Sequence, residues 1–180
     1  YCASFTPAGL AASAEVADGV FPIWLSPQQG GLIEDHLAPG FARRSDGRTR
    51  ADFDVAPTVM VAVGDDVEAC RRPVKEMLAL YVGGMGARDR NFYNRYTRDM
   101  GYEAAAVAIQ DLFLAGRREE AVQAVPDALV DEIALVGPLA RIRERAASWK
   151  RLGAEGRVGT LILGMRQPEH LGAIAEILLG

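Results

Sequence analysis

The sequence predicts an α/β fold, because short apolar runs typical of strands alternate with longer segments of helical periodicity. The run Phe53–Val63 alternates valines with smaller residues, and Val158–Gly164 is a second apolar run. Between them, apolar residues recur every three or four positions over Val67–Tyr81, which is the period of an amphipathic helix. This alternation fits a (β/α)8 barrel and an open doubly wound sheet equally well.

The N-terminal stretch predicts a strand, a tight turn, a helix and a second strand. Thr6 can cap a helix over residues 8–17, and Pro7 suits its first turn. The second strand, over residues 20–25, contains Pro22, which indicates a bulge or a strand end because proline cannot donate a ladder hydrogen bond. The turn brings a hydroxyl, backbone N–H groups and the positive end of a helix to one point. This suits a phosphate, and an ordinary capped helix is the alternative.

Ser26 and Pro27 predict the start of the next helix, since serine is a favoured cap and proline suits the first turn. The apolar stripe of that helix includes His36. We interpret His36 as a partly buried structural residue, because no carboxylate or second histidine accompanies it at a spacing that suits catalysis.

Three glycines within residues 83–86 predict a mobile or sharply turned segment after the long helix, because glycine is costly inside a helix. The segment over residues 91–96 is rich in aromatic residues. Two interpretations stay open for this stretch. In one, Met85, Phe92 and Tyr93 line the substrate side of a mobile lid; in the other, the rings only pack a connection between helices.

The C-terminal part predicts short helices, a longer outer helix, the strand Val158–Gly164 and a closing helix. These helices cover residues 103–115, 117–124, 128–133, 139–152 and 168–179. The short helices are an insertion before the last strand.

The composition indicates a globular protein without a nucleic-acid or membrane partner. The chain has 180 residues, 49% of them hydrophobic, and a net charge of -4 with both signs mixed. No apolar run approaches the roughly 18 residues that span a bilayer. Cys2 and Cys70 are far apart and match no metal spacing, so we expect reduced, buried thiols, no metal and a cytoplasmic protein. We also expect that Tyr1 is not the natural start, because the first residues already resemble a strand.

Motifs in chain order resemble the luciferase-like monooxygenase superfamily. Tyr1-Cys2-Ala3-Ser4-Phe5-Thr6-Pro7 is similar to the Tyr-x-Ala-Ala-Gly-Gly-Pro of many members, and Ala17-Asp18-Gly19 follows as it does there. The segments over residues 78–86, 100–102 and 135–138 resemble the branch that uses the deazaflavin coenzyme F420, which includes methylenetetrahydromethanopterin reductase-like enzymes. The resemblance covers nearly the whole chain but only the C-terminal half of such an enzyme.

The resemblance implies a fold and an activity. The fold would be strands five to eight of a (β/α)8 TIM barrel, so that residues 1–180 are the C-terminal half of a single domain and the N-terminal half is missing. The activity would be hydride transfer between F420 and a small organic substrate. An FMN-dependent monooxygenase and a non-catalytic barrel relative with a binding or scaffolding role are the alternatives. We also expect a homo-oligomer.

The resemblance also implies positions for the ligands. The coenzyme would contact Ala3, Ser4, Phe5 and Thr6, and the substrate would lie near Ile23 and Trp24, with the lid residues named above. Trp24 is also a candidate for plain core. Phe5 and Thr6 stand where many relatives have two glycines, and this departure affects how closely the backbone can approach a ligand. Catalytic residues would belong to the absent half, so none is assigned.

Overall fold

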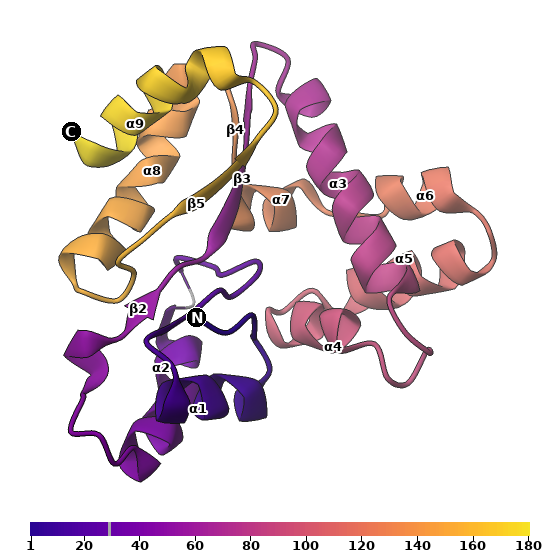
Figure 1. Cartoon of the computed structure of the whole chain (residues 1–180). Coiled ribbons are helices and arrows are strands. Elements are labelled where there is room, and N and C mark those ends of the chain that lie inside the picture. Colours follow the sequence, from indigo (N-terminus) through magenta and orange to yellow (C-terminus); the bar gives the residue numbers. More distant parts are fainter. Residues whose placement is uncertain (29) are drawn as a thin grey trace.

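Parallel strands run through the centre of the fold and helices flank them (Figure 1). The computed structural model describes residues 1–28 and 30–180. The strands are β1 (Gly19–Val20), β2 (Asp54–Val55), β3 (Thr58–Val63), β4 (Ala134–Gly137) and β5 (Ile162–Met165). The helices are α1 (Pro7–Val16), α2 (Gly30–Arg43), α3 (Val67–Gly84), α4 (Phe92–Asp99), α5 (Glu103–Leu114), α6 (Arg118–Gln123), α7 (Asp127–Ile133), α8 (Leu139–Ala154) and α9 (Leu171–Leu179), with 3-10 turns at Arg50–Asp52 and Pro168–His170. The predicted α/β class is confirmed.

The described strand pairs are all parallel, and β3 is the central strand of a sheet with the order β4-β3-β5. Cys2 forms a parallel bridge with Val20, β1 pairs with β2, and β3 pairs with β5. The predicted strands over residues 20–25 and 53–63 are both interrupted at a proline. β1 ends before Pro22 and resumes only as a bridge from Ile23 to Thr58, and Pro57 separates β2 from β3, because proline has no N–H for the ladder.

β4 was not predicted from the sequence, because four residues are too few to show a periodic pattern. Met60 lies between Ala134 of β4 and Gly164 of β5, while Thr58 lies between Ile23 and Ile162. β4 therefore pairs with the same edge of β3 as Ile23 does, but closer to the carboxyl end of β3. The short helices α4–α7 precede this strand, so the insertion comes earlier than the sequence predicted.

Two hydrophobic cores lie on opposite faces of β3. Val59 and Val61 pack in a core with residues of α1, α2, α8 and α9. Met60 and Ala62, on the other face, pack toward a second core built mainly on α3, α5 and α7. Figure 1 shows α8 and α9 on one side of β3 and β5, with α3–α7 on the other.

The prediction of a sharp turn at Gly83 and Gly84 is wrong, because α3 continues through both residues. A Cβ atom at Gly83 would lie 2.5 Å from Phe113 of α5, and one at Gly84 would also collide with that ring. The glycines thus let α5 approach α3 closely. Gly86, with φ of +126°, does turn the chain.

The helix predicted to start at Ser26 is shorter in the structure. Residues 26–28 are not helical, Gln29 lies outside the described residues, and α2 is described from Gly30. His36 is half-buried in α2, as predicted. Both cysteines are free thiols; Cys70 is buried, whereas Cys2 is half-buried. Among residues 1–28 and 30–180, no helix combines the length and the apolar character needed to cross a membrane.

Candidate functional site

The segments that follow the paired strands all lie at one end of the sheet, because the strands are parallel. They are Ala3–Thr6 after the bridge at Cys2, Trp24–Ser26 after the bridge at Ile23, Gly64–Asp66 after β3, and Arg166–Gln167 after β5. Folds of parallel strands and helices bind their ligands at this carboxyl end. The carboxyl end of the strands is therefore the place of the candidate site.

The first of these segments places hydroxyls over the start of α1. Thr6 caps the helix: its Oγ1 accepts a hydrogen bond from the Gly9 N–H at 3.2 Å, and Pro7 follows in the first turn. A Cβ atom at Gly9 would collide with Ser4 Oγ and lie 2.9 Å from Thr6 Oγ1, so both hydroxyls lie against this turn. The first turn carries no acidic residue. Hydroxyl donors at the positive end of a helix without a competing carboxylate suit an anion.

Phe5, between these two residues, belongs to an aromatic cluster. Its ring centroid lies 5.1–5.2 Å from those of Phe92, Tyr93 and Tyr96 on α4. Tyr93 also contacts Trp24 at 5.4 Å and Tyr81 of α3 at 4.8 Å. The resulting aromatic cluster consists of Phe5, Trp24, Tyr81, Phe92, Tyr93 and Tyr96. The turn thus offers hydroxyls for an anion and borders an apolar wall.

Trp24 is strained and deeply buried. Its φ is +53°, in the left-handed region that bulky residues rarely adopt, and its side chain is 3% exposed. At Trp24 the chain turns away from β3, after Ile23 has paired with Thr58. Further along β3, β4 occupies the edge that is left open. The Tyr96 hydroxyl donates to the Trp24 carbonyl at 3.2 Å, and burial, with the charges of Glu132 and Asp99, raises the pKa of Tyr96 to about 12. Tyr96 therefore stays a neutral donor at physiological pH.

A buried carboxylate anchors the same segment two residues further on. Glu132, at the end of α7, accepts hydrogen bonds from Ser26 Oγ at 2.5 Å and from the Tyr102 hydroxyl at 2.8 Å. Burial, and then the bond to Glu132, raises the pKa of Tyr102 to about 12. The segment from Trp24 to Ser26 is thus held by α4 at its start and by α7 at its end.

A cavity of about 590 Å³ lies beside the carboxyl-terminal halves of β3 and β5 and extends past their ends to Gly64 and Gln167. Its floor includes Met60 and Gly164, and one wall is formed by Cys70, Val74 and Met77 of α3. Tyr81, one turn beyond Met77, belongs to the aromatic cluster. One helix therefore borders both the cavity and the aromatic cluster.

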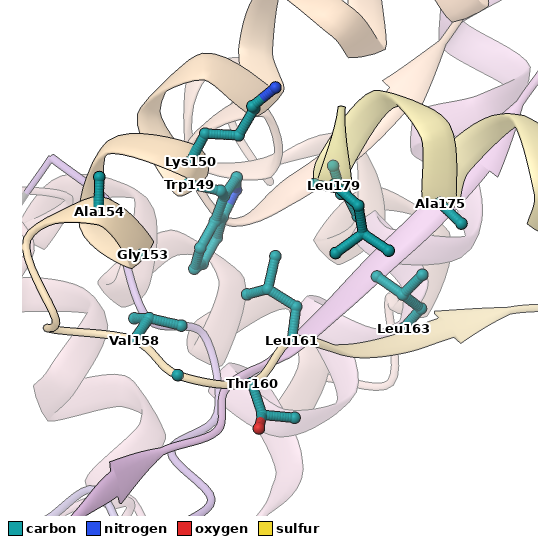
Figure 2. A pocket seen from close by; sticks show the side chains of 12 residues that line it. Trp149, Lys150, Gly153, Ala154, Val158, Thr160, Leu161, Leu163, Ala175 and Leu179 are labelled. Atoms are coloured by element: carbon teal, nitrogen blue, oxygen red, sulfur yellow. The ribbon is translucent and has the colours of Figure 1, made fainter.

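A second cavity, of about 370 Å³, opens elsewhere. Figure 2 shows Trp149 of α8, Leu161 and Leu163 near β5, and Leu179 of α9 around it. It lies beside the amino end of β5, where Val158 and Thr160 lead into the strand. Because ligands of this class of fold bind at the carboxyl ends, we do not assign it to the site.

The structure brings together some of the residues predicted from the sequence and separates others. Phe5, Trp24, Phe92 and Tyr93 meet in the aromatic cluster, and Ser4 and Thr6 lie beside it. Ala3 and Met85 are exposed, Met85 at the end of α3, and Ile23 pairs with Thr58 while packing toward the second core.

Sequence reasoning missed Tyr81, Tyr96, Met60 and Gly164. The aromatic residue types of the first two were a usable signal, because each lies on a helix beside residues already singled out. The role of Gly164 depends on its pairing with Met60 across two strands, which no local pattern reveals.

The chain is similar to known proteins both in sequence and in fold. The sequence profile of the luciferase-like monooxygenase family matches residues 1–156. A Mycobacterium tuberculosis protein, provisionally named as a coenzyme F420-dependent oxidoreductase, is 39% identical over 154 residues, which are 86% of this chain and 44% of that protein. The chain thus spans less than half the length of this curated relative.

Two solved structures resemble the fold. The coenzyme F420-dependent tetrahydromethanopterin reductase from Methanopyrus kandleri matches with a TM-score of 0.69 and 18% identity, over 98% of this chain and 47% of that one. An F420-dependent secondary alcohol dehydrogenase matches with a TM-score of 0.61 and 11% identity, over 96% of this chain and 47% of that one.

Proposed function

The chain belongs to the luciferase-like monooxygenase family, and from this premise we propose that it is part of an oxidoreductase that uses coenzyme F420. The observation that carries the proposal is the 39% identity to a relative whose name specifies this coenzyme. The fold likeness to two F420-dependent enzymes is consistent with it. When bound, the deazaflavin would supply hydride transfer to or from a small organic substrate.

The turn Ala3–Thr6 fits the phosphate-bearing part of such a coenzyme. Ser4 and Thr6 offer hydroxyls against the first turn of α1, and Gly9 leaves them the space to lie there. Their O–H groups would donate to phosphate oxygens, and the positive end of the helix would favour the charge. Phe5 would not contact phosphate through its ring, because its ring packs against α4.

The aromatic cluster would form an apolar border for the reacting groups. Tyr93 contacts four other rings of the cluster. The proposed lining on the substrate side consists of Tyr93 with Ile23, Trp24, Met85 and Phe92. A border of this kind excludes water from a hydride transfer. Phe92 is 40% exposed and Met85 44% exposed, so these two would contact a ligand only at the rim.

We propose further that residues 1–180 form strands five to eight of a (β/α)8 barrel. The parallel pairing of Cys2 with β1, of β1 with β2 and of β3 with β5 supports this, since neighbouring barrel strands pair in that way, while β4 lies outside this series on the other edge of β3. A further segment of the protein would then supply the remaining strands and the catalytic residues. A cytoplasmic location and assembly as a homo-oligomer remain part of this proposal.

Titration of the full-length protein with F420 and with FMN tests the proposal. Saturable binding of F420 and weak binding of FMN are expected. Preference for FMN would support the monooxygenase alternative, which the family name favours. Binding of neither coenzyme would contradict the proposal and leave a binding or scaffolding role.

A further inference from the structure

We infer that the cavity beside β3 and β5, which α3 connects to the aromatic cluster proposed above as the other border of the substrate site, binds an uncharged, largely apolar organic molecule, and that this molecule is the substrate of the proposed oxidoreductase. Calling this molecule the substrate rests on the proposed function, whereas the binding of an apolar molecule in the cavity does not depend on it. The cavity, of about 590 Å³, is large enough for a small organic molecule and lies at the carboxyl ends of two neighbouring parallel strands.

The interior of the cavity offers no partner for a charge. Met60, Val74, Met77 and Pro73 line it with apolar side chains, and Cys70 adds a buried thiol. A charged group placed among these side chains would lose its hydration without gaining a counter-ion. The cavity therefore selects for an uncharged ligand.

The polar groups at its mouth are largely engaged by the protein itself. The Gln167 amide donates to the Val63 carbonyl and accepts from the Val63 N–H, both at 2.8 Å. Asp66 Oδ1 accepts from the Ala69 N–H at 3.1 Å as the cap of α3. Asp65 and Arg166, also at the mouth, are exposed and of opposite sign. Together with Asp66, the mouth has two carboxylates and one guanidinium, so it gives an anionic ligand no net attraction.

Gly164 keeps the floor of the cavity open. It pairs with Met60, and a Cβ atom at Gly164 would lie 2.7 Å from Met60 Sδ, so the thioether lies over the glycine. Methionine is flexible, so an alanine at this position would move the thioether rather than break the strand. The displaced thioether would take up room that a ligand needs.

This geometry defines a set of variants with a matched control. Gly164→Ala narrows the cavity, and Gly164→Ala combined with Met60→Ala reopens it. Gly172→Ala, on α9, adds the same methyl group where nothing lies within 4 Å. The probes are 2-naphthol, which is neutral near pH 7, and its anionic relative 2-naphthoate. The fluorescence of each probe is measured as coenzyme-free full-length protein is added. The melting temperature is recorded for every variant.

The wild-type protein is expected to bind 2-naphthol, and to bind 2-naphthoate at least about tenfold more weakly. Gly164→Ala should weaken 2-naphthol binding about tenfold, the double variant should restore it, and Gly172→Ala should leave it unchanged.

Three results would overturn the inference. They are absence of 2-naphthol binding, equal affinity for the two probes, and a Gly164→Ala variant that binds 2-naphthol as the wild type does. An F420 titration of the same samples separates the two proposals. If the wild-type protein does not bind F420, the proposed function is contradicted, whatever the result with 2-naphthol.

Discussion

The Tyr96 hydroxyl donates a hydrogen bond of 3.2 Å to the main-chain carbonyl of Trp24, a residue held at a φ of +53°. A bulky residue in this conformation costs about 1–3 kcal/mol, so the surrounding structure has to hold it there. Tyr96 does so from α4, while the Trp24 ring packs on Tyr81 and Tyr93. The strained turn is thus fixed both through its backbone and through its side chain.

Replacing Tyr96 by phenylalanine should loosen this turn. Tyr96→Phe keeps the ring but leaves the Trp24 carbonyl without its donor, and we expect a loss of about 1 kcal/mol in the free energy of unfolding. Urea denaturation of the full-length protein measures it. Tyr93→Phe is the control, because in the described part of the chain its hydroxyl donates to no residue, and it should cost much less. Equal losses for the two variants would contradict the role given to Tyr96.

The contact between Gly83 and Phe113 should make the helix pair α3 and α5 sensitive to a single methyl group. A Cβ atom at Gly83 would lie 2.5 Å from the Phe113 side chain, so Gly83→Ala should cost about 1–3 kcal/mol despite the better helix propensity of alanine. Phe113→Leu in the same protein should recover part of the loss. Gly172→Ala should be neutral or stabilising, and thermal melts of the three variants test this. A stabilising Gly83→Ala would show that the helices separate easily.

Stability should fall at alkaline pH because of Tyr96 and Tyr102. The pKa of each is raised in the folded protein from 10.0 to about 12, chiefly by burial. The unfolded chain therefore releases these protons first, and the stabilisation, complete below about pH 10, is lost as the pH rises to about 12. Denaturation curves across this range should show a shallower decline in Tyr102→Phe than in the wild type. Parallel declines would contradict the assignment.

The proposed half-barrel predicts that residues 1–180 do not fold well alone. The edge strand β5 and the side chain of Ile162, which is 37% exposed, would lack the cover that neighbouring strands give in a closed barrel. Expressed alone, the fragment should aggregate or melt without a cooperative transition. A soluble monomer with a sharp thermal transition would contradict this prediction.

Local sequence patterns were sufficient for the elements whose signals are local. The alternation of valines with smaller residues distinguished the two faces of β3, and Thr6 with Pro7 identified the start of α1. The interruption at Pro22 was also predictable, because proline cannot donate to a ladder.

The remaining features depend on contacts between distant segments. Gly83 and Gly84 signal a turn by propensity, yet they stay helical because Phe113 of α5 occupies the space beside them. β4 forms because an edge of β3 is vacated after Ile23. The meeting of Phe5 with Phe92 and Tyr93 requires α4 to fold back on the first turn, which residue spacing does not reveal.

The coenzyme turn is tested most directly by Thr6→Asp in the full-length protein, with F420 affinity and melting temperature measured together. Aspartate caps a helix as well as threonine does, so the melting temperature should be unchanged, while its carboxylate would repel the phosphate. We predict an F420 affinity about ten- to a hundredfold weaker than that of the wild type. Thr6→Ser, which keeps the hydroxyl, should bind nearly as the wild type does. Equal F420 affinity for Thr6→Asp and the wild type would contradict the proposal that this turn holds the coenzyme.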